Sequence, residues 1–251
     1  MDSLSQHDRS LFHRLFWLSV SRGRLDAPES MVRWIISRFG SLERVQEQVV
    51  VRIVNRYTLE GAMYNPLRAS RPMEPMDPSK MEELINGSRA NDIFARPLEQ
   101  TPSDTFGRVQ GLYSITASNV AKADAHHGLV IFDEFNPMGA GRNQFREYVW
   151  AAQEWCRRAH REDPEAVHPV IIWNCLWRAG SSVTHGHFQM LVARGMPYGR
   201  VERLRQVAEW YRHERGASYF DDLFQAHRAL GCGVQAGPVR AMAYLTPTKE
   251  R

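Results

Sequence analysis

The spacing of hydrophobic positions predicts helices near the start of the chain and strands further on. Apolar residues recur at helical spacing over residues 11–20 and 28–39, so we predict two amphipathic helices there. Residues 47–64 are rich in β-branched side chains, and their pattern fits a helix passing into a strand without fixing the boundary. Two proline-containing stretches, residues 72–80 and 86–106, are predicted to be irregular.

A more regular pattern follows in the second half of the chain. Short apolar runs predict five strands, at residues 112–117, 127–132, 169–175, 184–193 and 239–245. Longer amphipathic segments predict three helices, at residues 141–160, 198–215 and 218–230. Antiparallel strands with helices on one face make an α+β protein.

Composition fits an ordinary globular protein and narrows the choice of ligand. The chain has 251 residues, of which 43% are hydrophobic and 24% charged, which suits one large domain or two small ones. A net charge of +4 is compatible with phosphate ligands but too small to argue for a nucleic-acid groove. The arginines of residues 200–215 alternate with acids, so a solvated helix face explains them better than a nucleic-acid-binding surface does.

Cysteine usage and hydropathy set the expected surroundings. The three cysteines are widely spaced and form no C-x-x-C pair, so neither a disulfide framework nor a cysteine-based zinc site is expected. No apolar run approaches the roughly 18 residues that a membrane span requires, and no export signal is seen. We therefore expect a cytoplasmic protein without a membrane partner.

Polar side chains alternate along the apolar run THGHFQMLV. In a strand, His185, His187 and Gln189 share one face, while the residues between them point into a core, namely Phe188, Met190 and Val192. An amide, a flexible turn and two hydroxyls lie just upstream, at Asn174, Gly180, Ser181 and Ser182. A solvated face of an edge strand is the alternative, but this clustering favours a site for an anionic ligand.

The residue types suit phosphoryl chemistry. A neutral imidazole is a good nucleophile toward phosphorus and a good leaving group once phosphorylated, so one histidine can divide a nucleotidyl transfer into two displacements. Gln189 and Ser182 can donate hydrogen bonds to the phosphoryl oxygens. Arg68 and Arg71 could pair with the remaining phosphate charge, although two surface arginines are the simpler interpretation of that pair alone.

The spacing of these residues resembles that of a known family. Asn174, Gly180, Ser182 and the three residues 185, 187 and 189 match the N…G-x-S-x-x-H-x-H-x-Q signature of the galactose-1-phosphate uridylyltransferases. These belong to the histidine-triad superfamily, which also includes the diadenosine tetraphosphate phosphorylases. The segment YNPLRASRP, residues 64–72, likewise resembles a phosphate-contacting segment of the uridylyltransferases. The resemblance covers roughly residues 57–245.

The resemblance implies a role for each residue. His187 would form a nucleotidyl-histidine intermediate, and His185 would orient it, largely through its backbone carbonyl. Gln189 and Ser182 would bind the phosphoryl group under attack. The expected substrate-binding residues are Arg68, Arg71, Asn119, Asn174, Gly180 and Ser181. Because the hydrolase branches usually carry a third histidine where this chain has Gln189, transfer is preferred over hydrolysis.

Two departures from the family matter. Uridylyltransferases commonly hold zinc with a C-x-x-C pair, a later histidine and the first histidine of the motif; here Phe94-Ala95-Arg96 and Asn136 occupy the approximate regions of the pair and of the later histidine. A closed zinc site needs four ligands, so we expect no metal and no other cofactor; a metal held by His126 and His127 together with His185 is the less favoured alternative. Relatives also continue beyond the point where this chain ends, so any active-site residue from that half would come from a partner subunit or be missing. Because members of this superfamily tend to pair, the resemblance implies a homodimer.

The resulting prediction has three functional alternatives. The preferred one is a nucleotidyltransferase or nucleotide phosphorylase with a histidine-triad-like sheet at residues 47–251 and an N-terminal helical extension at residues 1–46. Its substrates would be a nucleotide sugar or a nucleoside di- or polyphosphate, with phosphate or a sugar phosphate as acceptor. The alternatives are a nucleotide or phosphoramidate hydrolase and a non-catalytic nucleotide-binding protein. Four tryptophans are interpreted as core residues rather than as a base-stacking pocket, at positions 150, 155, 173 and 177.

Overall fold

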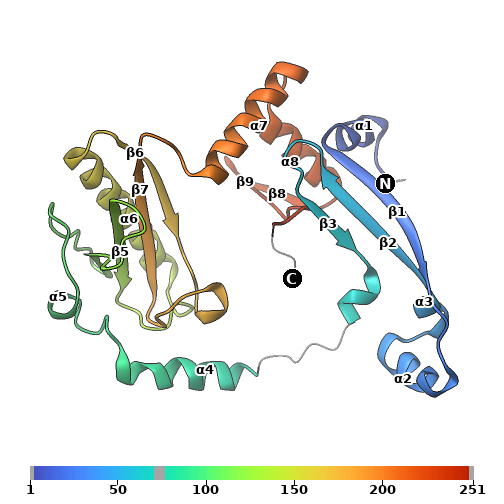
Figure 1. Ribbon diagram of the computed structural model, residues 1–251, viewed down its shortest axis with the longest axis horizontal. Coiled ribbons are helices and arrows are strands. Elements are labelled where there is room, and N and C mark those ends of the chain that lie inside the picture. Colours follow the sequence, from blue (N-terminus) through green and yellow to red (C-terminus); the bar gives the residue numbers. More distant parts are fainter. Residues whose placement is uncertain (1–2, 71–76, 249–251) are drawn as a thin grey trace. The chain divides into compact units, whose positions relative to one another are not determined.

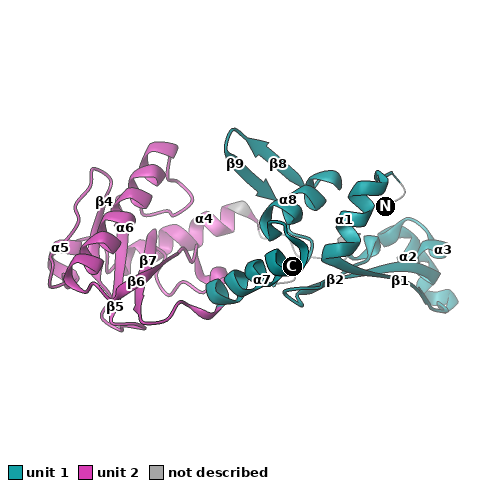
Figure 2. Cartoon of the chain, turned by 90° about the horizontal axis from the view of Figure 1, so that it is seen from above, with its two compact units in different colours: residues 1–74, 200–251 teal, residues 75–199 magenta. Residues whose placement is uncertain are grey.

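A computed structural model describes residues 3–70 and 77–248 of the chain (Figure 1). Helices and antiparallel sheets make up an α+β protein, as predicted. The chain divides into two compact units, one formed by Met1–Glu74 with Arg200–Arg251 and the other by Pro75–Gly199 (Figure 2). Along the chain, the two units meet at other positions than residue 46, after which the sequence predicts a domain boundary. That domain boundary stays a prediction.

The unit Pro75–Gly199 is built on a four-stranded antiparallel sheet in the order β4-β5-β7-β6. Its strands are β4 Ser114–Ser118, β5 His126–Phe132, β6 Ala166–Ile172 and β7 His187–Arg194. The long helix α6, Arg142–Glu162, packs on one face of this sheet through Tyr148 and Trp155, which are fully buried. These side chains meet Phe188, Met190 and Val192 of β7, so the predicted core residues are confirmed.

Because side chains alternate along a strand, His187 and Gln189 lie on the opposite face of the sheet, beside a small apolar cluster. Leu129 and Ile131 of β5 pack there against Phe94, and the register places Leu129 opposite Gln189 and Ile131 opposite His187. On the face toward α6, Gly128 lies so close to Trp155 that a Cβ would come within 2.5 Å of the indole. Only glycine fits there, because any side chain would push α6 away from the sheet.

Short helices occupy the segments that were expected to be irregular. They are α4 Pro78–Gly87, η2 Ser88–Asn91 and α5 Pro97–Gln100. The side chain of Asp77 accepts a hydrogen bond from the backbone N–H of Ser79, and Pro78 takes the first helical position of α4. Proline favours that position because its missing N–H would be unpaired anyway, so the prediction of loops alone was wrong here. Residues 71–76 lie outside the described residues.

The second unit joins the two ends of the described chain. Its three-stranded antiparallel sheet consists of β1 Phe16–Arg24, β2 Glu47–Asn55 and β3 Gly61–Tyr64. Its helices are α1 Gln6–Leu15, α2 Glu29–Phe39, α3 Leu42–Gln46, α7 Gly199–Arg215 and α8 Tyr219–Ala229, and η1 Pro66–Ser70 follows β3. A hairpin of β8 Gly233–Ala236 and β9 Val239–Met242 completes it. Phe12 and Phe16 pack in its core with Tyr211 and Tyr219.

The N-terminal segment corrects one prediction. The helix expected over residues 11–20 ends at Leu15, and Phe16–Arg24 is a strand that pairs residue by residue with Glu47–Asn55. Pairing with a distant strand satisfies the backbone groups of this segment that face β2, and this tertiary gain outweighs the helical spacing of its apolar residues. The first 46 residues are therefore not wholly helical, and residues 47–55 are strand throughout.

Two further findings complete the fold. Only one of the four tryptophans is fully buried, Trp155, while Trp150, Trp173 and Trp177 are between 38% and 48% exposed. Trp150 lies on another face of α6, and Trp173 follows the end of β6, so the core interpretation was wrong for these three. Within residues 3–70 and 77–248, no helix combines the length and the apolar character needed to cross a membrane.

Candidate active site

The strand β7 begins at His187, three residues later than predicted, and His185 and Gly186 form a short link that precedes it. The link is fixed by two backbone hydrogen bonds, from the N–H of Phe132 to the carbonyl of Gly186 and from the N–H of Gly186 to the carbonyl of Phe135, 2.9 and 3.0 Å long. A Cβ at Gly186 would lie 2.4 Å from the ring of Phe132. Glycine therefore allows the main chain to lie close enough for both bonds.

Hydrogen bonding assigns the tautomer of His187. Its Nδ1 lies 2.8 Å from the carbonyl oxygen of His185, and because a carbonyl only accepts, Nδ1 carries the proton. Nε2 then keeps the lone pair of a neutral ring. None of the described residues forms a hydrogen bond with this Nε2. The contact with His185 is the one that the resemblance implies for an orienting residue.

Burial keeps the His187 ring neutral. The residue is only 8% exposed, and burial lowers the pKa of its imidazole below the ordinary value. The hydrogen bond to the His185 carbonyl raises this pKa in part, and the charge of the His185 ring lowers it further. At neutral pH the Nε2 lone pair is therefore available to an electrophile.

A cavity of about 240 Å³ lies against His187. Apolar side chains form part of its wall, among them Ile93, Phe94, Leu129 and Val183. Polar groups are supplied by Asn119, Ser182 and Gln189, together with Gln100, Thr101 and Ser118. No charged side chain is found among its described lining residues. The cavity thus offers neutral hydrogen-bond donors beside a nucleophilic nitrogen.

A histidine that the sequence did not place at the site orients Gln189. The backbone N–H of Ala123 donates to Nδ1 of His127 over 3.0 Å, so Nε2 of that ring carries the proton. This Nε2 lies 3.2 Å from Oε1 of Gln189, which therefore accepts. Burial lowers the pKa of His127, which favours the neutral form that this arrangement needs. The amide nitrogen of Gln189 is left to donate to another acceptor.

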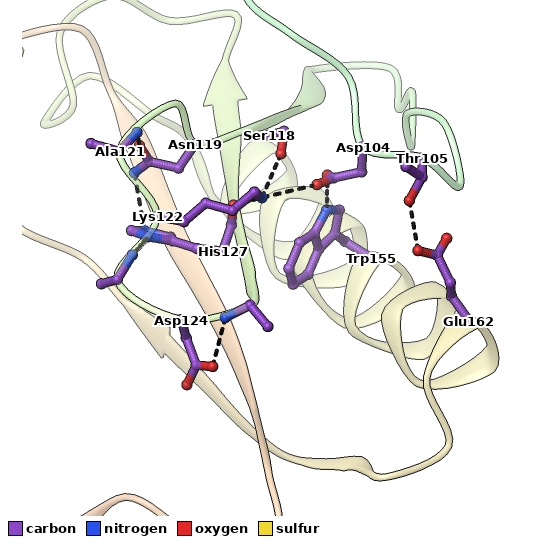
Figure 3. Close-up of polar contacts among 12 residues, drawn as sticks. Asp104, Thr105, Ser118, Asn119, Ala121, Lys122, Asp124, His127, Trp155 and Glu162 are labelled. Carbon is purple, nitrogen blue, oxygen red and sulfur yellow. Dashed lines mark hydrogen bonds and ion pairs between the residues drawn. The ribbon is translucent and has the colours of Figure 1, made fainter.

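A polar network fixes the loop between Asn119 and β5 (Figure 3). The ammonium group of Lys122 lies 2.7 Å from Oγ of Ser118 and 3.2 Å from the carbonyl oxygen of His127. Asp104, 3.7 Å from the same ammonium, accepts a 2.6 Å hydrogen bond from the indole N–H of Trp155. The β4–β5 connection is thereby tied to α6. Oδ1 of Asn119 accepts from the N–H of Ala121 over 3.0 Å.

The other predicted site residues are not among the described residues that line this cavity, apart from Ser182 and Asn119. Gly180 has a φ of +94°, a conformation that favours glycine, and Oγ of Ser181 donates to the carbonyl of Val183 rather than facing a ligand. Asn174 follows β6 half-buried and is not among the described residues that line the cavity. Arg68 belongs to η1 in the other compact unit, and Arg71 lies outside the described residues. The contact of the arginine pair with this ligand therefore stays a prediction.

Both ring nitrogens of His185 are held by protein acceptors. Nδ1 lies 2.8 Å from Oδ2 of Asp92, and Nε2 lies 2.7 Å from the carbonyl oxygen of Phe132. With both nitrogens engaged by protein groups, the ring has no nitrogen open to a metal, and the part of the chain that the structure describes brings no three His, Cys, Asp or Glu side chains together around one. The residues present therefore do not fit the zinc of the uridylyltransferases. Asp92 was not predicted, although it lies two residues before the segment 94–96 where the cysteine pair is missing.

Comparison with known proteins finds similarity at the level of structure. The chain matches no protein-family model, and no curated protein matches it. Its structure is similar to a HIT family hydrolase from Clostridium thermocellum, at 20% identity and a TM-score of 0.35, over 42% of this chain and 93% of that one. It is also similar to a HIT family member from Bacillus subtilis, at 21% identity and a TM-score of 0.36, over 51% and 99% of the two chains. A third similar structure is the diadenosine triphosphate hydrolase of Plasmodium falciparum, at 12% identity and a TM-score of 0.33, over 45% and 81%.

Proposed function

We propose that this protein is an enzyme of the histidine-triad type that transfers a nucleotidyl group through a covalent intermediate on His187. The donor would be a nucleotide sugar or a nucleoside di- or polyphosphate, and the acceptor phosphate or a sugar phosphate. The observation that carries this proposal is the His187 ring: it donates through Nδ1 to the His185 carbonyl, its Nε2 has no hydrogen-bond partner among the described residues, and the residue lines a cavity of about 240 Å³.

The geometry suits two successive displacements. In the first, Nε2 of His187 attacks the α-phosphorus, a nitrogen–phosphorus bond forms, and the bond to the leaving phosphate oxygen breaks with its electron pair. In the second, an oxygen of the acceptor attacks the same phosphorus, and the pair of the nitrogen–phosphorus bond returns to Nε2. The Nδ1–H bond to the His185 carbonyl stabilises the positive charge that the ring carries between the two steps. The amide of Gln189 and the hydroxyl of Ser182 would donate to the phosphoryl oxygens.

Gln189 supports transfer rather than hydrolysis. Its Oε1 is engaged by His127, and an amide takes up no proton at neutral pH, so it cannot activate a water molecule as a base. An anionic phosphate needs no such deprotonation before it attacks. The neutral lining of the cavity also suits the singly charged phosphorus of an anhydride or ester better than a terminal, doubly charged phosphate.

The experiment is the trapping of the intermediate. We expect the intact mass of the protein to increase by one nucleotidyl group when it is incubated with the correct member of a panel of UDP-, ADP- and GDP-sugars and dinucleoside polyphosphates without acceptor. Peptide mapping should locate the group on His187, and the variant His187→Gln should stay unmodified. The half-buried His168 on β6 offers a matched control, because His168→Gln should label like the wild type.

Three other outcomes would contradict the proposal in different ways. Release of nucleoside monophosphate that is indifferent to added phosphate would identify a hydrolase. Thermal stabilisation by a nucleotide without any adduct or product would identify a non-catalytic binding protein. An unmodified protein that no member of the panel stabilises would remove the nucleotide hypothesis itself.

A further inference from the structure

Asp92 links the His185 ring to the turn that carries Phe94. Oδ2 of Asp92 accepts from Nδ1 of His185 over 2.8 Å, and Oδ1 accepts from the backbone N–H of Phe94 over 2.9 Å. The side chains of Asp92 and His185 are only 8% and 7% exposed. Such a pair is shielded from solvent and held in one geometry, in contrast to the exposed ion pairs of α6 and α7.

The hydrogen bonds define where the protons are. The carbonyl of Phe132 can only accept, so Nε2 of His185 carries a proton. The carboxylate of Asp92 accepts from the N–H of Phe94 through one oxygen and engages Nδ1 of His185 through the other. Asp92 and the Phe132 carbonyl therefore hold the His185 ring at both of its nitrogens.

This pair acts on His187 along two paths. The His185 ring is anchored at both nitrogens, and its own backbone carbonyl receives the Nδ1 proton of His187, so fixing the ring also fixes that acceptor. The turn that Asp92 closes carries Phe94, whose ring stands edge-on to both imidazoles, with centroids 5.9 Å from His185 and 5.3 Å from His187. Phe94 is also a wall of the cavity.

We propose that Asp92 is a positioning residue of this site: it holds the His185 ring at Nδ1 and thereby fixes the tautomer and direction of His187. The proposal deepens the proposed function and rests on it for its effect on rate. Its structural part, the tautomers of the two rings, is independent of any substrate. Neither Asp92 nor His185 is among the described residues that line the cavity, so both act through His187 and Phe94.

Ring nitrogen signals test the structural part. In protein labelled with ¹⁵N-histidine and assigned through single His→Gln variants, we expect His185 to show a proton on Nε2 and His187 to show a proton on Nδ1 alone. In Asp92→Asn, which keeps the shape but removes the charge, both rings should keep these protons. In Asp92→Ala, His187 should show a mixture of its two tautomers. A wild-type His185 without a proton on Nε2, a mixture of His187 tautomers in the wild type, or an unchanged His187 in Asp92→Ala would overturn the proposal.

Labelling kinetics test the effect on the reaction. We expect Asp92→Ala to slow formation of the His187 adduct by about 10-fold to 100-fold, the range typical of residues that orient a reacting group, with a smaller change in nucleotide affinity. Asp92→Asn should recover much of this loss, because it can still accept from Phe94 and pair with His185. The matched control is Asp163→Asn, which removes the other Asp–His pair of the same unit, 3.3 Å between Asp163 and Nε2 of His126, and should leave the rate unchanged.

The two readouts separate the two proposals. If no nucleotide labels the wild type, the proposed function fails, while the ring nitrogen signals still decide the role of Asp92. If the wild type labels and Asp92→Ala labels equally fast, the role of Asp92 fails alone. Should Asp92→Ala not fold, the wild-type spectrum and Asp92→Asn still decide the matter.

Discussion

Two buried histidines, one in each compact unit, show what separates a structural ring from a reactive one. His227 on α8 donates through Nδ1 to the carbonyl of Leu223 over 2.7 Å, and its Nε2 accepts from the N–H of Leu245 over 3.1 Å. His187 donates in the same way to the His185 carbonyl over 2.8 Å, but its Nε2 has no hydrogen-bond partner among the described residues, and the residue lines a cavity. Burial lowers the pKa of both rings.

The difference lies entirely in the second nitrogen. In His227 both nitrogens are engaged, so the ring ties the segment after β9 to α8 and has no lone pair to offer. In His187 the lone pair is left free at the wall of a cavity that also contains Gln189 and Ser182. A low pKa by itself therefore does not mark a reactive histidine; an open nitrogen beside space for a ligand does.

The largest expected effect comes from making the same substitution in both rings. His187→Gln should abolish the covalent adduct, because an amide is not a nucleophile toward phosphorus. His227→Gln should keep the adduct, since a glutamine there can donate to Leu223 and accept from Leu245, at a cost of about 1 kcal/mol in stability. Intact mass and denaturant unfolding of both variants measure this. Labelling of His187→Gln, or its loss in a folded His227→Gln, would contradict the distinction.

Removal of the Gln189 side chain, a hydrogen-bond donor in the same cavity as His187, should have the next largest effect. Gln189→Ala removes the amide that we expect to meet the phosphoryl oxygens, and loss of one such donor typically lowers a rate by about 100-fold to 1,000-fold. The rate of adduct formation measures this effect under single-turnover conditions. Loss of a comparable size in Asn174→Ala, which does not line the cavity, would show that the site extends further than the cavity does.

A smaller effect, on stability, follows from the lowered pKa values. His127, His187 and His227 all have a pKa below the ordinary value in the folded protein, with burial as the main cause. The unfolded chain then binds more protons below about pH 6.5, so their stabilisation is complete above that pH and is lost as the pH falls. Each ring contributes a slope of up to about 1.4 kcal/mol per pH unit. Urea unfolding between pH 8 and pH 5.5 should show a shallower loss in His227→Gln, and an equal loss would contradict this.

Sequence patterns located the elements that are strongly periodic and buried. The strand predicted at residues 127–132 is β5 His126–Phe132, and the helix predicted at residues 141–160 is α6 Arg142–Glu162. The first part of the strand Phe16–Arg24 was predicted to be helix. The strand forms by pairing with Glu47–Asn55, and the local spacing of apolar residues does not indicate a pairing partner that far along the chain.

The candidate site was predictable to a similar extent. The motif with its two histidines and one glutamine pointed to residues 185, 187 and 189, and the structure places His187 and Gln189 around one cavity with Ser182 and Asn119, while the His185 carbonyl accepts from His187. The contacts of His127 with Gln189 and of Asp92 with His185 were not predicted, because they are made through strand pairing and a turn, from 60 and more positions away along the chain. Whether the arginines act on the same ligand stays a prediction.

Local sequence was sufficient to decide which side chains share a face. His187 and Gln189 oppose Phe188 and Met190 because side chains alternate along any strand, whatever lies around it. Only the tertiary structure decided which imidazole nitrogen is left open. The groups that settle this are mostly backbone carbonyls and N–H groups, at His185, Phe132 and Ala123. Every residue carries the same backbone groups, so their positions leave no trace in the sequence until the chain has folded.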